Sequence, residues 1–192
     1  MKKILITLAA LSLMTFAAAA SANLIGLFAD AQGTVCKANF PVYSQVDVHI
    51  IAQLSDIAGV TAVEFRIGGV PDPAGSAIIS KYWDSPLVIG DPLGIGVSVA
   101  FSDPMAGPNV HIGRLNIFTI NGSWPGSDSK WCAEATLDSG NLVVVDDAFN
   151  LIEVDGWCFV ANCTVGGPYG NCQCGDQIAT EDTNWGSVKA LY

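Results

Sequence analysis

Positive charge and histidine are scarce in this 192-residue chain, which has 8 Lys and Arg and 2 His against 18 Asp and Glu, a formal net charge of −10. A surface this acidic repels the phosphate backbone, so we expect no nucleic-acid partner. Nucleophilic catalysis of the Ser-His-Asp or Cys-His kind needs a histidine held by a carboxylate. His49 has Asp47 two positions before it, but that spacing is ordinary on the polar face of a strand.

The recurring motifs of catalytic and cofactor sites are also missing. The chain has no G-x-S-x-G and no H-E-x-x-H, and Gly94-Ile95-Gly96 lacks the rest of a dinucleotide fingerprint. An acidic group at Asp146, Asp147, Glu153 and Asp155 lacks EF-hand spacing, which leaves calcium binding open. We therefore predict no catalytic residue, no cofactor, no metal ligand and no enzymatic activity.

Long hydrophobic runs are confined to the N-terminus. Lys2 and Lys3 precede an apolar run that starts at Ile4 and ends in the small residues Ala20-Ser21-Ala22. This pattern is typical of a secretory signal peptide, and its apolar core is shorter than the ~20 residues that span a bilayer. We expect residues 1–22 to be removed from a bacterial protein that is then periplasmic, on the cell surface or extracellular, without a membrane span.

Capped helical periodicity is absent from the body of the chain, and strand patterns take its place. Apolar and polar residues alternate from Val46 to Leu54, and a second alternation puts Val63, Phe65 and Ile67 on one face. Further strands are expected in NLIGLFAD, IGVSVAF, HIGRLNIFTI, WCAEATL, NLVVVDD and FNLIEVDGW, whereas AIISKYW fits a strand or a helical turn.

Turn-forming residues separate these strands, in GGVPDPAGS, IGDPLG, SDPMAGPN, NGSWPGSDS and LDSGN. Several short strands with such turns between them predict an all-β fold. The expected architecture is an antiparallel β-sandwich over residues 23–175, followed by a C-terminal tail over residues 176–192.

Cysteine is absent from the predicted signal peptide, and all six cysteines follow it: Cys36, Cys132, Cys158, Cys163, Cys172 and Cys174. An even number in an exported chain predicts a disulfide framework. The spacing lacks the paired C-x2-C knuckles of a zinc site and the C-x-x-C of a redox centre. A bond between Cys172 and Cys174 would be strained, so we expect separate partners for them. Cys163 and Cys158 are the near candidates, and Cys36 and Cys132 are the distant ones.

Aromatic residues are the remaining candidates for ligand contact, at Tyr82, Trp83, Trp124, Trp131 and Trp157. Large aromatic side chains either fill a core or form flat platforms for sugars and partner proteins. Trp124 lies within the loop-like NGSWPGSDS, so it is the predicted exposed ligand-binding residue. The partner would then be a surface protein or a glycan.

Two stretches resemble known proteins. Uncharacterised secreted bacterial proteins have opening strands similar to YSQVDVHIIAQLSDIAGVTAVEFRIGGVP and carry a phrase close to TAVEFRI. Their TWGxVKALY-like ending, which often continues with an arginine, resembles EDTNWGSVKALY. The strand order also resembles the cohesin and immunoglobulin-like sandwiches. The resemblance implies a fold and an exported destination, and it brings no catalytic residues.

The tail ends on apolar residues with helical spacing, Trp185, Val188, Leu191 and Tyr192, which predicts a short C-terminal helix or a docking or sorting segment. Together these patterns predict a secreted, non-enzymatic β-sandwich protein with a structural, adhesive or binding role. The alternatives are a carbohydrate-binding module that uses exposed aromatics and a small secreted hydrolase.

Overall fold

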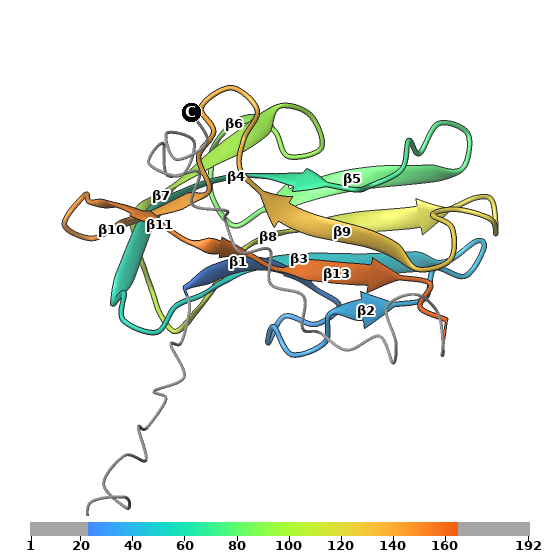
Figure 1. The fold of residues 1–192 in the computed structure, drawn as a ribbon, viewed down its shortest axis with the longest axis horizontal. Coiled ribbons are helices and arrows are strands. Elements are labelled where there is room, and N and C mark those ends of the chain that lie inside the picture. Colours follow the sequence, from blue (N-terminus) through green and yellow to red (C-terminus); the bar gives the residue numbers. More distant parts are fainter. Residues whose placement is uncertain (1–22, 165–192) are drawn as a thin grey trace, which may run out of the picture.

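Two β-sheets packed face to face form the body of the protein (Figure 1). The computed structural model describes residues 23–164, so the predicted signal peptide, the tail and its predicted helix lie outside the described residues. The first sheet has five strands, in the order β12 (Asp155–Gly156), β1 (Leu24–Phe28), β3 (Gln45–Gln53), β8 (Asn109–Thr119) and β5 (Ala77–Trp83).

The second sheet has eight strands. Six follow one path, in the order β11 (Leu151–Glu153), β10 (Val143–Asp146), β4 (Gly59–Gly68), β9 (Ser129–Glu134), β13 (Cys158–Ala161) and β2 (Lys37–Ala38). The other two are β7 (Gly96–Ala106), which pairs with β4, and β6 (Leu87–Asp91), which pairs with β7. Pairing is antiparallel except between β1 and β12 and between β13 and β2. The predicted antiparallel β-sandwich is confirmed.

Alternation along the long strands builds the core between the sheets. Val48, Ile50 and Leu115 of the first sheet and Val63 and Phe65 of the second are all at most 1% exposed, and they belong to one apolar cluster. Burial of a side chain of this size contributes about 1.5–3 kcal/mol to folding. The polar residues between them on each strand point outward, so the polar and charged side chains of these strands lie on the two outer faces of the sandwich.

Two segments expected to be turns are parts of strands. Residues 89–91 of IGDPLG belong to β6, and residues 102–106 of SDPMAGPN continue β7. The register of β6 and β7, from Leu87 opposite Ala100 to Asp91 opposite Gly96, shows why. Backbone pairing with a neighbouring strand outweighs the weak strand preference of Gly and Asp. AIISKYW, which the sequence left undecided, forms β5.

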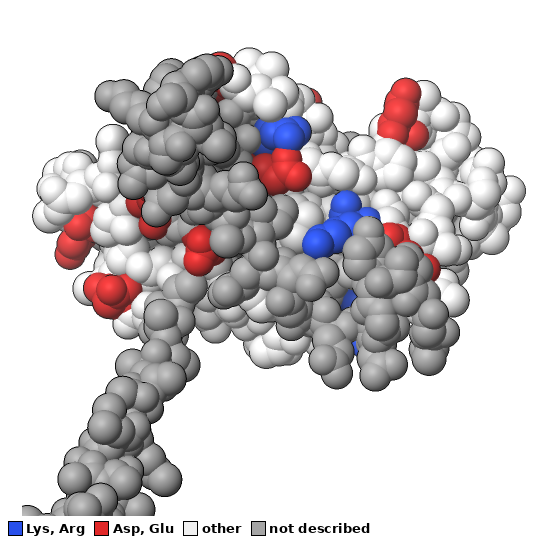
Figure 2. All heavy atoms as spheres, in the orientation of Figure 1, with Lys and Arg blue, Asp and Glu red and all other residues white. Residues whose placement is uncertain are grey.

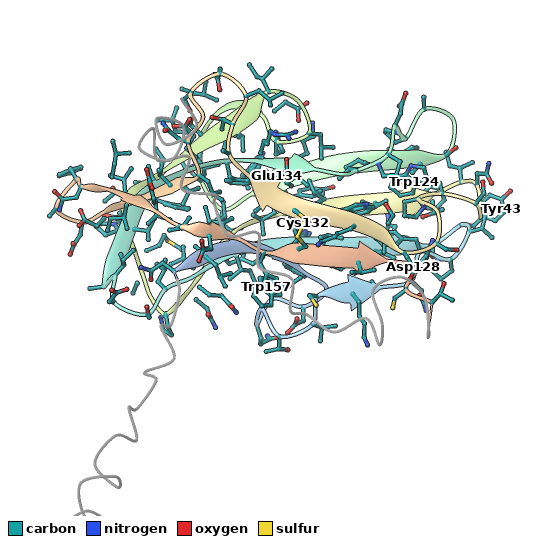
Figure 3. The ribbon with its side chains drawn as sticks, viewed as in Figure 1. Tyr43, Trp124, Asp128, Cys132, Glu134 and Trp157 are labelled. Atoms are coloured by element: carbon teal, nitrogen blue, oxygen red, sulfur yellow. A yellow bond between two sulfur atoms is a disulfide. The ribbon has the colours of Figure 1, made fainter. Side chains whose placement is uncertain are left out.

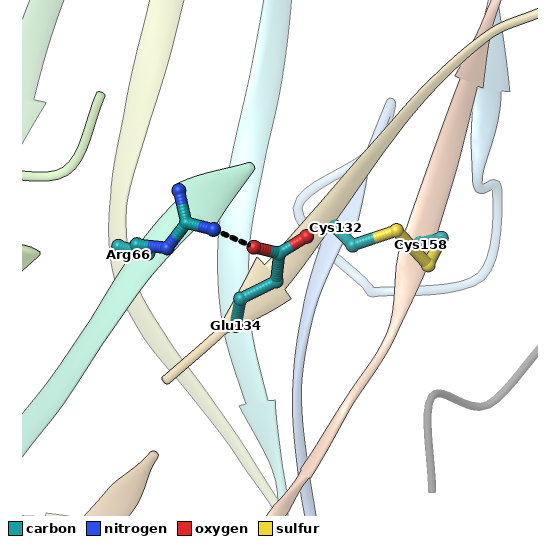
Figure 4. Close-up of a disulfide and its surroundings, with 4 residues drawn as sticks. All are labelled: Arg66, Cys132, Glu134 and Cys158. Carbon is teal, nitrogen blue, oxygen red and sulfur yellow. Dashed lines mark hydrogen bonds and ion pairs between the residues drawn. A yellow bond between two sulfur atoms is a disulfide. The ribbon is translucent and has the colours of Figure 1, made fainter. Parts of the chain in front are cut away.

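One disulfide joins two neighbouring strands of the second sheet (Figure 4). Cys132 of β9 lies directly opposite Cys158 of β13, so the predicted framework is present for this pair. Cys36 and Cys163 are also disulfide-bonded. Cys36 precedes β2, whose Lys37 pairs with Val160 of β13, and Cys163 follows the end of β13.

The other two cysteines, Cys172 and Cys174, lie outside the described residues. Because Cys132 and Cys158 bond each other, the distant candidate Cys36 and the near candidate Cys163 remain as possible partners for Cys172 and Cys174. This supports the expectation that Cys172 and Cys174 take separate partners, which stays a prediction.

Gly69 follows β4 with a backbone that other residues rarely adopt. Its φ is +81°, and a Cβ there would lie 2.1 Å from the carbonyl oxygen of Lys130. We expect Gly69→Ala to lower the free energy of unfolding by at least ~2 kcal/mol, since left-handed strain adds to a clash with a backbone atom. Urea denaturation measures the change. Gly75→Ala is the matched control, because Gly75 has a φ of +69° with nothing within 4 Å. Equal losses at both positions would contradict the role given to the Lys130 contact.

Candidate functional site

The outer face of strands β6, β7 and β4 is flat because small side chains occupy its middle. The register places Ala100 of β7 between Leu87 of β6 and Ala62 of β4. In the next row of the same face, Ser98 lies opposite Ile89. Alanine and serine side chains allow the backbone of another molecule to approach the sheet closely.

Large aliphatic side chains border this flat face. Leu87 and Ile89 of β6 are 54% and 67% exposed, and Ile95 and Leu137 beyond the end of β6 are 59% and 65% exposed. The backbone N–H of Leu137 donates to the carbonyl oxygen of Ile95 at 2.7 Å, so these two residues lie together. We call these four residues the β6 apolar edge.

The β6 apolar edge also lies next to a strand side without a pairing neighbour among the described residues. Within the part of the chain that the structure describes, β6 pairs with β7 alone, which makes it an edge strand. Exposed aliphatic residues scattered singly are ordinary, whereas a group of them on an open edge is typical of an interaction surface.

A polar network borders the flat face on the side of β9. Oε1 of Glu64 accepts hydrogen bonds from the Thr136 hydroxyl at 3.1 Å and from the Ser139 hydroxyl. Arg66 forms an ion pair with Glu134, beside the disulfide (Figure 4). These hydrogen bonds and the ion pair hold the polar side chains in place. Across the face, large aliphatic side chains on β6 are thus followed by small ones on β7 and by fixed polar ones on the side of β9.

Trp124 does not form the exposed platform that the sequence predicted. It is 5% exposed, and its ring centroid lies 6.0 Å from that of Phe40 and 5.8 Å from that of Trp131. Figure 3 labels it at one end of the sandwich. The predicted exposure is wrong because the β8–β9 loop turns back and directs the Trp124 ring into the core. The backbone N–H of Trp124 donates to the backbone carbonyl of Asn121 at 3.1 Å, which closes this turn. The exposure on which its sugar-binding role was predicted is therefore absent.

Two members of the acidic group, Asp146 at the end of β10 and Asp147 after it, lie at the turn between β10 and β11, whereas Glu153 ends β11 and Asp155 begins β12. Oδ1 of Asp146 accepts from the backbone N–H groups of Ala148 and Asn150 at 2.9 and 2.7 Å. Hydrogen bonds from the Asn150 side chain and backbone lower the pKa of the Asp146 carboxyl. Figure 2 shows Asp and Glu side chains gathered at this end of the visible face. Among residues 23–164, no group of three or more His, Cys, Asp or Glu side chains is placed to hold a metal ion.

The two histidines contact each other on the outer face of the first sheet. His49 Nδ1 lies 2.8 Å from His111 Nε2, and His111 Nδ1 lies 2.6 Å from Oδ2 of Asp84. Asp47, which the sequence placed nearest to His49, forms an ion pair with Arg114 at 3.4 Å. Burial of His49 and the charge of His111 beside it lower the pKa of His49.

Neither the β6 apolar edge nor the histidine contact was predicted from the sequence. The available signal for the edge was the apolar triplet Leu87-Val88-Ile89 between Pro86 and Gly90, which is short enough to be taken for a turn. For the histidines no signal existed in the order of residues, because they lie 62 positions apart.

No protein-family model and no curated protein matches the chain. Among solved structures, the sixth cohesin of scaffoldin B from Acetivibrio cellulolyticus, in complex with a Cel5 dockerin, is similar at 13% identity over 75% of this chain and 100% of that one, with a TM-score of 0.44. A non-cellulosomal cohesin from Archaeoglobus fulgidus is similar at 13% identity over 77% of this chain and 94% of that one, also with a TM-score of 0.44. Identities and scores this low do not place the chain in the cohesin family.

The described part of the chain contains no helix long and apolar enough to cross a membrane. Export, surface location and the resemblance to uncharacterised secreted bacterial proteins stay predictions of the sequence.

Proposed function

We propose that the protein is an exported, non-enzymatic binding module that docks a partner protein on the outer face of β6, β7 and β4. The observation that carries the proposal is the β6 apolar edge, whose four aliphatic side chains are more than half exposed, two on β6 and two beyond its end. Apolar groups gathered in this way leave water most favourably against another apolar surface.

The rest of the face fits the anatomy of a protein interface. The small side chains of Ala62, Ser98 and Ala100 let a partner lie close, and the Arg66–Glu134 pair and the Glu64 network form a polar border. Interfaces of this kind combine an apolar centre with a polar rim that fixes orientation. A glycan would need an exposed aromatic platform instead. Trp124 and Trp131 are buried, and the half-exposed Tyr82 ring is covered by the Arg114 guanidinium, 5.0 Å from its centroid.

Substituting the edge tests this function. The mature protein is immobilised and exposed to exported proteins of its own cells, and the proteins that it captures are quantified by mass spectrometry. We expect binding of a partner held by the parent to fall at least ~10-fold in Leu87→Asp/Ile89→Asp, because buried charges replace the apolar contacts of β6.

The control is Val42→Asp/Ile78→Asp, which changes two other exposed aliphatic residues that are 45% and 56% exposed and lie away from β6. Circular dichroism and thermal unfolding of each variant report that the fold is kept. Equal capture by the edge variant and the parent, or capture lost equally in the control, would overturn the proposal.

A further inference from the structure

The contact between His49 and His111 depends on an irregularity in strand β8. Residues on the outer face of a regular strand keep one parity, and Asn116 and Arg114 are even-numbered. The pairing of β3 with β8 shifts at Ile50 and Ile51, which lie opposite Gly113 and His111. This β-bulge turns Ile112 into the core, where it is 0% exposed, and brings His111 onto the outer face.

Asp84 is held next to His111 by the backbone. The N–H of Asp84 donates to the carbonyl oxygen of Ile112 at 3.1 Å, which fixes the turn after β5 against the bulge. From that position the Asp84 carboxylate accepts from Nδ1 of His111 at 2.6 Å. Asp84, His111 and His49 thus form a row, with the carboxylate behind one imidazole and the other imidazole in front of it.

When both rings are neutral, the row fixes where the imidazole hydrogens lie. Because Nδ1–H of His111 donates to Asp84, its Nε2 carries a lone pair, and that lone pair accepts from Nδ1–H of His49. In protein metal sites, a carboxylate that accepts from one imidazole nitrogen orients the ring so that the other nitrogen binds the metal. The side chains of His111 and Asp84 are 26% and 46% exposed, so water and ions reach the row.

We propose that His49 Nδ1 and His111 Nε2 bind one divalent copper ion, with Asp84 positioning the His111 ring and water completing the coordination. Metal–imidazole bonds are about 2.0 Å long, so two such bonds at the right angle of tetragonal geometry separate the nitrogens by about 2.8 Å. The two ring nitrogens already lie 2.8 Å apart. The hydrogen bond between the rings has the same length, so the choice of metal follows from affinity: among the divalent ions of the first transition row, copper binds imidazole donors most tightly.

Binding needs no net release of a proton. The ion replaces the hydrogen between the two rings, and His49 carries its hydrogen on Nε2 instead of Nδ1 while remaining neutral. Burial of the His49 ring and the positive charges of His111 and Arg114 oppose a cation there, whereas the negative charges of Asp47 and Asp30 attract one. The formal charge of −10 on the whole chain adds to the attraction.

The experiment uses the mature protein without a histidine tag. His49 and His111 are its only histidines, so any imidazole signal comes from them. Calorimetric titration with Cu²⁺ should show one ion per chain, and electron paramagnetic resonance should show coupling to two imidazole nitrogens. Zn²⁺ should bind more weakly than Cu²⁺.

Three variants separate the roles within the row. We expect the double variant His49→Gln/His111→Gln to abolish the imidazole coupling. Asp84→Asn should weaken Cu²⁺ binding by about 10–100-fold, as is typical when the hydrogen-bond partner of a metal-binding histidine is replaced. Asp72→Asn, an exposed carboxylate in the loop after β4, is the matched control and should leave binding unchanged. Unchanged Cu²⁺ affinity in the double histidine variant, or a parent spectrum without imidazole coupling, would show that the two rings share only a proton, and it would overturn the proposal.

Discussion

Replacing Cys132 and Cys158 together with alanine should lower the free energy of unfolding by about 3.5 kcal/mol, the chain-entropy value for a loop of this length. The disulfide closes a separation of 26 residues and ties β9 to β13. Without it the unfolded chain regains the freedom that the loop had removed, whereas the strand pairing of the folded state is kept. Guanidinium denaturation of the mature protein under oxidising conditions measures the change.

A valine pair at the same two positions is the control for the disulfide. Both cysteines are buried, so alanine also leaves space in the structure, and valine refills it with a side chain that suits a strand. Loss of stability that the alanine and valine pairs share reports the cross-link itself. A shared loss below about 1 kcal/mol would contradict the entropic role, since the relation predicts several times that amount.

Trp131→Ala should destabilise the protein by about 3–5 kcal/mol, as expected for removing a large aromatic side chain from a core. Trp131 is 0% exposed, and its ring centroid lies 5.2 Å from Phe40, 5.5 Å from Phe159 and 5.8 Å from Trp124. The indole N–H of Trp131 donates to the Ser129 hydroxyl at 2.9 Å. Alanine would leave a cavity that three rigid aromatic rings cannot close. Thermal and urea denaturation measure the loss.

Two further variants serve as controls for Trp131→Ala. Trp131→Phe keeps most of the apolar volume and should cost clearly less than alanine. Leu151→Ala removes a side chain that is 70% exposed and should change stability by no more than about 0.5 kcal/mol. A loss at Trp131 no larger than the loss at Leu151 would show that the aromatic cluster does not stabilise this end of the sandwich.

Most strands were predictable because apolar and polar residues alternate along the sequence of a half-buried strand. The alternation from Val46 to Leu54 predicts β3 within one residue at each end, and the inward set of Val63, Phe65 and Ile67 is the buried face of β4. β6 was missed because an edge strand with one neighbour and exposed aliphatic side chains has no such alternation of apolar and polar residues.

The candidate sites were much less predictable than the strands. Trp124 lies in a segment composed of turn residues, and composition does not tell whether a loop turns its one aromatic side chain outward or into the core. His111 was expected at the start of a regular strand, and a bulge of one residue reverses which side chains of that strand face the solvent.

Local pattern and composition alone therefore determined the class of fold, the acidic surface, the expectation of export and the presence of a disulfide framework, because each depends on residue type and short-range order. Tertiary structure decided which cysteine faces Cys132, that Trp124 is buried, that β6 presents its aliphatic side chains to solvent and that His49 meets His111. These outcomes depend on strand register and on contacts between residues far apart in the chain, and a shift of one residue in the pairing changes all of them.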